Sequence, residues 1–588
     1  MGFLLIAMIL LTERIGIVYK AQDTSKQILP REEVQNLKVI PKEHDTLIVY
    51  DPENAASTKA MTQYDSIMTD MRVGYDKVEI SRVTNAVISK YKKLIIIFPN
   101  LNDWSTQIET VKEWTDKGGH LMLGYRPQYS GVLASLSDEL GIKEFNDDYI
   151  LVNSFISEPD FMLGSKSTYH IIDGYESSID PVLSGESHVY AKTEAGLPLI
   201  WKHKTEKGMT VVCNFAYCDK AYRGIFAAAF SLLDDVTVYP VINASTYYLD
   251  DFPSPVQMGD ATYIKRDYNM DVAEFYSSIW WPDVLKLSDK HNIQYTGLII
   301  ETYSDKTKGR LAKNEVTSDY DYFGNLLLGK GGEIGWHGYN HQPLCTNTFT
   351  YKENKGYNRW PDKKEMKKSL KELDKFTTEL FPEEKAQVYV PPSNILSDEG
   401  RDVLTKNFKN IKAIASIYFT GKDEYSQEFS VSPDGIVETP RIVSSCVLDD
   451  YMRISAFSEL NMHYVNSHFM HPDDLLDVDR GAEIGWKKLS ANLDDYMTWV
   501  DESAPDIEHV TGSGMAGAVQ RFVNVIPETK IVNGCVEIDI AGLLDKANFF
   551  VRINEGEVGK VSGGNLTKLN DTLYLLKADK EKVSIELK

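Results

Sequence analysis

Short apolar runs alternate with amphipathic stretches through the first third of the chain. Residues 46–50 (TLIVY), 94–98 (LIIIF) and 119–124 (GHLMLG) are mainly apolar, and helical patterns over residues 55–71 and 104–117 separate them. Such strands, buried on both faces, are typical of a parallel sheet covered by helices. The pattern predicts an α/β fold that begins with a doubly wound parallel-sheet domain over residues 44–240.

This first domain resembles the flavodoxin-like and glutamine-amidotransferase-like modules attached to many carbohydrate-active enzymes. An amidotransferase needs a nucleophile on a tight turn after a strand. The strand over residues 94–98 instead runs into Pro99-Asn100-Leu101-Asn102, which holds neither Cys nor Ser. A glycine-rich phosphate loop is also absent from the sequence. We therefore expect a non-catalytic scaffold or a sugar-binding role for this domain.

Two further regions follow, a second domain over residues 241–515 and a tail over residues 521–588. The tail holds short alternating strands, which predict a small β-sandwich-like module. These strands cover residues 535–540, 548–553, 572–576 and 582–587.

The N-terminal segment carries a targeting signal in this interpretation. Gly2 to Leu11 is a continuous apolar run, too short to cross a bilayer but suited to the core of a signal peptide or signal anchor over residues 1–22. A polar, Lys/Glu-rich linker over residues 23–43 follows. We expect a bacterial protein that is secreted or anchored at the cell surface, in contact with the membrane through this segment alone. A buried N-terminal helix is the alternative.

The charge balance excludes one class of partner. The chain has 63 basic and 86 acidic residues, a net charge of −23. No basic surplus is available to neutralise phosphates, so we expect no nucleic-acid partner. A cationic partner such as an amino-sugar polymer is compatible with this charge, although acidity also simply favours solubility. The five cysteines show no paired spacing, so they predict neither a disulfide framework nor a structural zinc site.

Candidate chemistry lies at the ends of strands in the second domain. A predicted strand ends in Asp250 and Asp251 before Pro253, where a turn can send both carboxylates into one cleft. His337 and His341 follow another strand at a spacing that brings two rings together in a helix or turn. Imidazole and carboxylate are ligands for zinc and related cations. Either pair alone is modest evidence, because turns and helix surfaces produce the same letters.

Two more strand ends complete a set. Residues 388–394 (VYVPPSN) end a strand in a double-proline turn, and residues 464–474 (YVNSHFMHPDD) carry His468 and His471. In this order the four elements resemble the NodB-type polysaccharide deacetylases of carbohydrate esterase family 4, from Val241 to about Asp479. Within that family the chain is most similar to the deacetylases of Pel-type exopolysaccharide, in which a sheet-and-helix domain precedes the catalytic barrel.

The resemblance implies a distorted (β/α) barrel that removes N-acetyl groups from an extracellular N-acetylhexosamine polymer. It implies Asp250 as the general base, with Asp251, His337 and His341 as ligands of a divalent metal ion. Zinc is the default for these ligands, while nickel, cobalt and iron also fit them. The late histidine protonates the leaving amine; His471 fits this role, and His468, three residues earlier, is the rival. The metal ion and a backbone N–H near Tyr389 to Pro392 would bind the oxyanion.

The sequence departs from the family in two places. The usual Arg before the PP turn is replaced by Tyr389-Val390, and we expect Arg441 to supply that charge, with an ordinary surface arginine as the alternative. The carboxylate that tunes the catalytic histidine is also unclear in the sequence, and the candidates are Asp449, Asp450 and Asp473. The candidates for substrate contacts are Pro391, Pro392, Asn394 and Trp336, while Trp280 and Trp281 are either sugar-stacking or buried residues.

Two other functions remain open at this point. A glycoside hydrolase on a similar barrel would use a pair of carboxylates such as Glu301 and Asp250, but it leaves the two histidines unexplained. A non-catalytic protein that binds polysaccharide or assists its assembly is the second alternative. The expected partners are an N-acetylated polysaccharide and the machinery that synthesises and exports exopolysaccharide.

Overall fold

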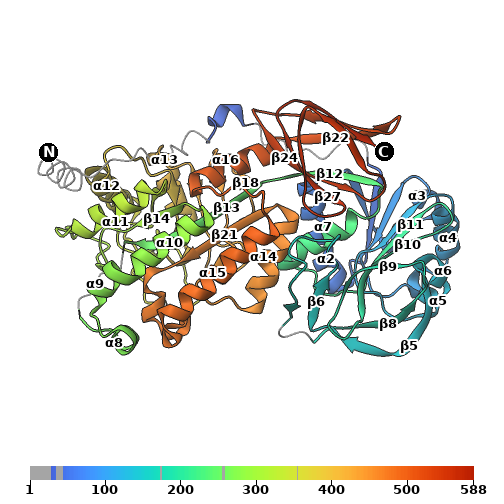
Figure 1. The fold of residues 1–588 in the computed structure, drawn as a ribbon, viewed down its shortest axis with the longest axis horizontal. Coiled ribbons are helices and arrows are strands. Elements are labelled where there is room, and N and C mark those ends of the chain that lie inside the picture. The colour runs from blue at the N-terminus through green and yellow to red at the C-terminus, as the bar shows by residue number, and fades with distance from the viewer. Residues whose placement is uncertain (1–27, 35–43, 172–174, 254–258, 354) are drawn as a thin grey trace, which may run out of the picture.

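The structure, a computed structural model, describes residues 28–34, 44–171, 175–253, 259–353 and 355–588 (Figure 1). It confirms the predicted α/β fold: one of the two nine-stranded sheets is mixed, and the other is parallel except for one pair of strands. The predicted signal segment and most of the 23–43 linker lie outside the described residues. Among the helices that are described, none has the length and apolar character needed to cross a bilayer.

The first domain is built on a nine-stranded sheet in the order β2-β1-β3-β4-β11-β10-β9-β6-β7. Its first five strands are parallel, as predicted, but β11, β10, β9, β6 and β7 pair antiparallel, so the sheet is mixed. The strands are β1 (Thr46–Tyr50), β2 (Tyr75–Glu79), β3 (Lys93–Ile96), β4 (His120–Leu123), β6 (Ser154–Ser157), β7 (Tyr169–His170), β9 (His188–Lys192), β10 (Pro198–Lys204) and β11 (Met209–Cys213). A separate antiparallel pair is formed by β5 (Ile142–Leu151) and β8 (Ser177–Leu183).

Helices cover both faces of this sheet because its strands alternate between two cores. Leu47 and Val49 lie in one core and Ile48 in the other, as the two-residue period of a strand requires. One core packs against α4 (Ile108–Asp116), α5 (Gly131–Ser135) and α6 (Ser137–Leu140). The other packs against α2 (Ala55–Asp70) and α7 (Arg223–Phe230). The short α3 (Asn85–Ile88) precedes β3.

A second nine-stranded sheet forms the barrel domain, in the order β18-β19-β17-β16-β15-β14-β13-β21-β20. Every neighbouring pair is parallel except β18 with β19. Its strands are β13 (Ala244–Phe252), β14 (Tyr295–Ile299), β15 (Glu333–Trp336), β16 (Val388–Tyr389), β17 (Ala413–Ile414), β18 (Ser430–Val431), β19 (Val437–Glu438), β20 (Val443–Ser444) and β21 (Val465–Met470). Its helices are α8 (Thr262–Tyr268), α9 (Val272–Phe275), α10 (Trp281–His291), α11 (Ser318–Gly329), α12 (Lys363–Leu380), α13 (Asp398–Asn407), α14 (Asp450–Met462), α15 (Trp486–Ser503) and α16 (Gly512–Val523).

The barrel sheet curls almost back onto itself. Strand β20 forms one edge and β19 lies next to the other, yet only residues 439–442 separate them in the chain. An extended chain spans at most about 3.3–3.6 Å per residue, and a connector of this length therefore holds the two edges close together. Arg441 lies in this connector.

The C-terminal domain is a sandwich of two four-stranded antiparallel sheets around a core of its own. The predicted strands are present as β23 (Cys535–Ala541), β24 (Ala547–Ile553), β27 (Leu573–Ala578) and β28 (Lys582–Leu587), joined by β22 (Ile526–Val532), β25 (Val558–Ser562) and β26 (Gly564–Lys568). The eighth strand, β12 (Val236–Val241), comes from the segment before the barrel and pairs with β24 along its whole length. The sandwich is thus not contained in residues 521–588.

The first domain and the barrel touch where α7 crosses α14. The backbone of Gly224 lies so close to α14 that a Cβ there would stand 1.8 Å from the carbonyl oxygen of Ser458, and the Gly224 N–H donates to Ser458 Oγ at 2.9 Å. Nearby, the Asn461 side chain accepts from Leu163 N at 2.8 Å and donates to Leu163 O at 3.0 Å. These buried polar contacts fix the two domains against each other.

Candidate active site

A cleft of about 310 Å³ opens at the carboxyl ends of the barrel strands, where functional residues of such barrels gather. Strands β13, β15, β16 and β21 run parallel, so their ends lie on the same side of the sheet. Asp250, Asp251, His341, Asn394 and His471 line this cleft. The sequence places these residues at four separate strand ends, and the fold brings them together.

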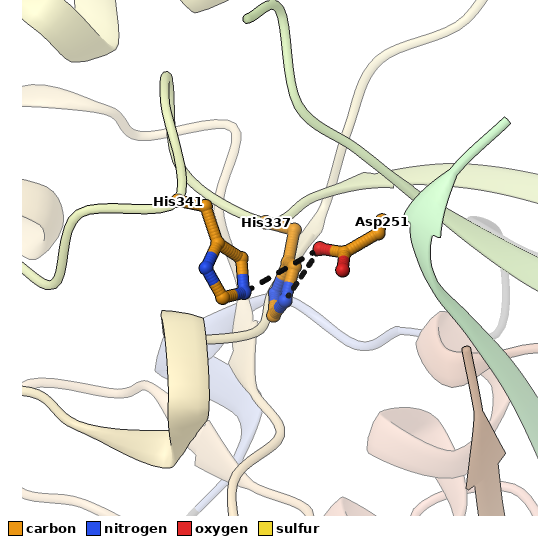
Figure 2. A group of neighbouring side chains, drawn as sticks. All are labelled: Asp251, His337 and His341. Atoms are coloured by element: carbon orange, nitrogen blue, oxygen red, sulfur yellow. Dashed lines mark ion pairs between the residues drawn. The ribbon is translucent and has the colours of Figure 1, made fainter. Parts of the chain in front are cut away.

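Asp251, His337 and His341 form a three-residue cluster with metal-ligand chemistry (Figure 2). The Oδ1 atom of Asp251 lies 3.4 Å from His337 Nε2 and 3.5 Å from His341 Nε2. Figure 2 shows both imidazole rings turned toward this carboxylate. The three ligand atoms all lie within 4.8 Å of one another, and the two separations of 3.4 and 3.5 Å are those of ligands placed about 2.0–2.2 Å from one tetrahedral cation.

Hydrogen bonding favours a cation at this position. The carbonyl oxygen of Val390 lies 2.9 Å from His337 Nδ1 and accepts its proton, which leaves Nε2 with a lone pair for a ligand. His337 Nε2 and Asp251 Oδ1 are both buried, and neither has a hydrogen-bond partner among the described residues. Burial lowers the pKa of His337 to about 4, so the ring is neutral at physiological pH. The residues present therefore fit a divalent ion with nitrogen and oxygen ligands.

Left-handed backbone conformations shape the cleft. Asp251, His341, Ser393 and Asn394 have φ angles of 54°, 55°, 48° and 59°, which residues other than glycine seldom adopt. At Asp251 the conformation coincides with a register irregularity between β13 and β14, and it lets consecutive carboxylates enter one cleft. The sequence predicted a turn at Pro253 for this purpose, whereas the structure turns the chain at Asp251 itself. Strain of this kind gathers at functional sites.

Asp250 forms an ion pair with Arg441, which lies in the connector between β19 and β20. Arg441 Nη1 donates to both carboxylate oxygens at 2.7 Å, and Nη2 donates to Asn394 Oδ1 at 2.5 Å. Both charged residues are 1% exposed. Burial raises the pKa of Asp250, but Arg441, His337 and His471 outweigh it and lower the pKa to about 2. Arg441 thus occupies the place that the sequence assigned to it, beside the predicted base.

His471 reaches Asp250 from the opposite side of the cleft. Its Nε2 lies 3.6 Å from Asp250 Oδ2, and its Nδ1 lies 3.4 Å from Asp474 Oδ1. Burial lowers the pKa of His471, but the Asp474 hydrogen bond and the charge of Asp250 raise it to about 9. The ring is therefore a cation at neutral pH, able to donate a proton. Asp474 in turn accepts from Arg480 Nη1 at 3.1 Å.

The carboxylate that lies beside His471 is Asp474, which was not among the candidates from the sequence. Of the three candidates, Asp449 caps α14 by accepting from Met452 N at 2.7 Å. Asp450 lies at another cavity, and Asp473 lines the cleft but pairs with Arg480 at 3.4 Å rather than with His471. The signal was available: a carboxylate three residues after His471 can return to it when a turn follows, and Pro472 begins such a turn.

Other predicted residues lie outside the cleft. His468 is buried with Nε2 2.8 Å from Ser445 O, and burial lowers its pKa to about 4. Trp336 is 1% exposed and packs edge-on against Phe408 on the other side of the sheet. The neighbouring Trp280 and Trp281 are also buried in the core. Trp336 directly precedes His337 on a strand end, so the two side chains point to opposite faces.

The double-proline turn acts through its neighbours. Pro391 and Pro392 have no N–H, and Val390 N donates to Trp336 O at 2.8 Å, so these three residues offer no oxyanion donor. Asn394 lines the cleft, as do Tyr303, Tyr357 and Arg480, which the sequence analysis did not single out. Glu301, the second acid of the glycosidase alternative, is buried at 1% exposure and is not among the residues that line the cleft.

Comparisons with known proteins bear on the chain as a whole. The model of the family described as "Uncharacterised protein conserved in bacteria (DUF2194)" matches residues 3–187 and 183–575. No curated protein matches the chain. Among solved structures, a putative polysaccharide deacetylase from Mycobacterium smegmatis is 16% identical with a TM-score of 0.31, over 48% of this chain and 91% of that one.

Two further solved structures are more distant. The Bc1960 peptidoglycan N-acetylglucosamine deacetylase is 13% identical with a TM-score of 0.25, over 46% of this chain and 87% of that one. The exo-beta-1,4-mannosidase from Opitutaceae bacterium strain TAV5 is 11% identical with a TM-score of 0.24 over 32% of this chain, and the match spans only 36% of the mannosidase. At TM-scores of this size a likeness establishes neither a shared fold nor a shared chemistry.

Proposed function

The chain belongs to the DUF2194 family of proteins conserved in bacteria, and we propose that it is a metal-dependent hydrolase that removes N-acetyl groups from a polysaccharide. One observation carries this proposal. Two buried ligand atoms without partners, Asp251 Oδ1 and His337 Nε2, face each other beside an arginine-held carboxylate and a histidine with a raised pKa. This combination provides a cation site, a proton acceptor and a proton donor in one cleft.

Asp251, His337 and His341 would hold the metal ion. A divalent ion there would supply a Lewis acid for the acetyl carbonyl oxygen and would lower the pKa of bound water from about 15.7 toward 7. Zinc is the ion we expect first, since two imidazoles and one carboxylate leave positions for water and substrate. Nickel, cobalt and iron fit the same ligands.

Asp250 is the proposed base for the attacking water. The Arg441 ion pair keeps this carboxylate ionised and fixes its orientation, while its neighbours His337 and His471 face it from two sides. A carboxylate with a pKa of about 2 is a weak base. Asp250 can therefore take a proton from a water whose pKa is already lowered, but not from a free water.

His471 is the proposed proton donor to the leaving amine. The Asp474 carboxylate binds the Nδ1 side of the ring, so the Nε2 proton points into the cleft toward Asp250. The C–N bond of the acetamide breaks as the nitrogen takes this proton, and the amino sugar and acetate leave. His468 has no part in this step, because its ring nitrogen is committed to Ser445 O.

The substrate and the location belong to the same proposal. We propose that the substrate is an N-acetylhexosamine polymer outside the bacterial cell, of the Pel type that the family resemblance suggests. We propose the machinery that synthesises and exports this polymer as the partner. Two sequence features support this: the apolar N-terminal run over residues 2–11 and the net charge of −23, which suits a product that carries free amines.

Metal content and acetate release together test the proposal. Purified protein should bind about one divalent ion per chain by elemental analysis and release acetate from an N-acetylated polymer whose chain length stays unchanged. EDTA should stop the release, and zinc, nickel, cobalt or iron should restore it. His337→Ala should lose the metal, whereas Asp250→Asn should keep the metal and lose turnover. His188→Ala, at an exposed histidine of the first domain, is the matched control that should change neither.

Other outcomes identify the alternatives. Chain cleavage without metal dependence would favour a glycoside hydrolase. Bound metal with no activity on any polymer in a broad panel would favour a non-catalytic polysaccharide-binding or assembly protein. A protein that binds no divalent ion at all would refute the proposed chemistry, because Asp250, with a pKa of about 2, is too weak a base to activate a free water by itself.

A further inference from the structure

A second cavity, of about 370 Å³, lies where the first domain meets the barrel, and it shares no lining residue with the catalytic cleft. Three elements form it: β7 with the residues just before it, α14 and α15. Its size falls within the range of small-molecule sites, about 300–1,000 Å³. Its walls therefore come from two domains that the chain holds in a fixed relation.

An aromatic platform forms one wall of this cavity. The rings of Tyr496 and Trp499, on α15, stack with centroids 5.8 Å apart and an interplanar angle of 18°. Trp499 Nε1 donates to the hydroxyl of Tyr169 at 3.2 Å, and Tyr169 donates to Gly164 O at 2.8 Å. The Tyr169 ring itself stacks on Phe457 at 4.1 Å. Trp499 is half-buried, so its ring is fixed from behind and open on the cavity side.

Polar side chains that are exposed or half-exposed surround the platform. Asp450 and Arg453, both on α14, line the cavity, and neither side chain has a hydrogen bond or ion pair with another residue that the structure describes. They lie one helical turn apart. Ser167 and Thr168 add hydroxyl groups on the facing side. The cavity thus offers a carboxylate acceptor, a five-proton guanidinium donor and hydroxyls around an aromatic face.

We propose that this cavity is a saccharide-binding site, separate from the hydrolytic cleft. A sugar ring has an apolar face of C–H groups that packs on an aromatic ring, and a rim of hydroxyls that both donate and accept hydrogen bonds. The Tyr496–Trp499 platform matches the face, while Asp450 and Arg453 match the rim. A lipid chain would leave the two charged side chains without a counterpart, whereas a sugar ring meets both the aromatic face and the polar rim. The inference rests on these lining residues and not on the proposed hydrolysis.

Binding of defined hexasaccharides to the full chain tests this site. The probes are the hexamers of N-acetylglucosamine, of glucosamine and of galacturonic acid, titrated by calorimetry into Asp250→Asn protein so that no probe is consumed. We expect two binding events per chain for at least one hexamer, and a single event after Trp499→Ala is added. Arg453→Ala should weaken the second event about tenfold. Trp499→Phe should keep it within about threefold, because the ring remains.

The control is Tyr322→Ala, which removes an exposed aromatic residue of α11 outside the cavity and should leave both events unchanged. Circular dichroism and thermal melting confirm that each variant is folded. The proposal is overturned if none of the hexamers binds, or if Trp499→Ala binds them with the stoichiometry and affinity of its parent. A wild-type protein that releases acetate while no binding event depends on Trp499 refutes this site alone, whereas Trp499-dependent binding by a protein that releases no acetate refutes the hydrolase alone.

Discussion

Replacing Arg441 by methionine removes the charge that holds Asp250 while keeping a long apolar side chain in its place. The pKa of Asp250 is about 2, against an ordinary value of 3.8. At about 1.36 kcal/mol per unit, this difference corresponds to about 2 kcal/mol of stabilisation at neutral pH. Removing one partner of a buried ion pair strands the other, which costs about 3–5 kcal/mol. We expect a loss of that size in Arg441→Met.

The stability difference between wild type and Arg441→Met should depend on pH. Asp250 has a depressed pKa in the folded wild type, so its stabilisation is present above pH 4 and is lost as the pH falls toward 2. In Arg441→Met, burial is opposed by His337 and His471 alone, so the pKa of Asp250 rises. The stability difference between the two proteins should therefore be largest near neutral pH and shrink in acid.

Urea denaturation in EDTA, from pH 3.5 to 7.5, measures this difference without a contribution from bound metal. Acetate release should fall at least a hundredfold, and the acid limb of kcat/KM should move to higher pH. Arg401→Met is the matched control: it breaks ion pairs with Asp434 at 2.6 Å and with Glu438 at 3.0 Å, none of which line the cleft, and it should lose stability but keep kcat. A deficit that does not change with pH, together with an unshifted acid limb, would show that Arg441 does not control Asp250.

Three further predictions concern other parts of the molecule. Asp474→Asn should lower the pKa of His471 from about 9, so the alkaline limb of kcat/KM should move to lower pH; an unmoved limb would exclude this histidine as the acid. Burial lowers the pKa of His463, but Glu459 and Asp70, a residue of the first domain, raise it to about 9. The resulting stabilisation of about 3 kcal/mol should be full below pH 6.5 and should be lost as the pH rises through 9. Equal urea midpoints for His463→Gln and wild type at pH 6 would contradict this. Gly224→Ala should destabilise by at least about 1–3 kcal/mol, because its Cβ would overlap α14, whereas Gly131→Ala, with open space around it, should be neutral within about 0.5 kcal/mol in the same thermal melts.

Much of the candidate active site could be predicted because the carboxyl ends of parallel strands lie on one side of a sheet. Asp250, Asp251, His337 and His471 each follow an apolar run, so their convergence needs only the sheet order. The position of Arg441 was harder to predict. It depends on the curl that brings β19 near β20, a long-range property that no local pattern encodes.

Other features were not readable from the sequence for distinct physical reasons. The left-handed conformation of Asp251 is imposed by the surrounding fold, since aspartate only tolerates it. The antiparallel half of the first sheet consists of short, partly polar strands whose pairing direction is set by connections and not by composition. Asp474 was missed in favour of its neighbour Asp473, because a single turn decides which of two adjacent carboxylates faces His471.

The pairing of β12 with β24 means that the C-terminal sandwich can be completed only after the barrel has been synthesised. Strand β12 leaves the ribosome before the barrel, and its partner emerges only after the barrel has been synthesised. Until then β12 presents unpaired N–H and C=O groups, the kind of edge that recruits other chains. A chain that ends in the last domain before β24 would therefore have a complete barrel and an exposed, aggregation-prone strand edge. We expect quality-control proteases to degrade such a chain.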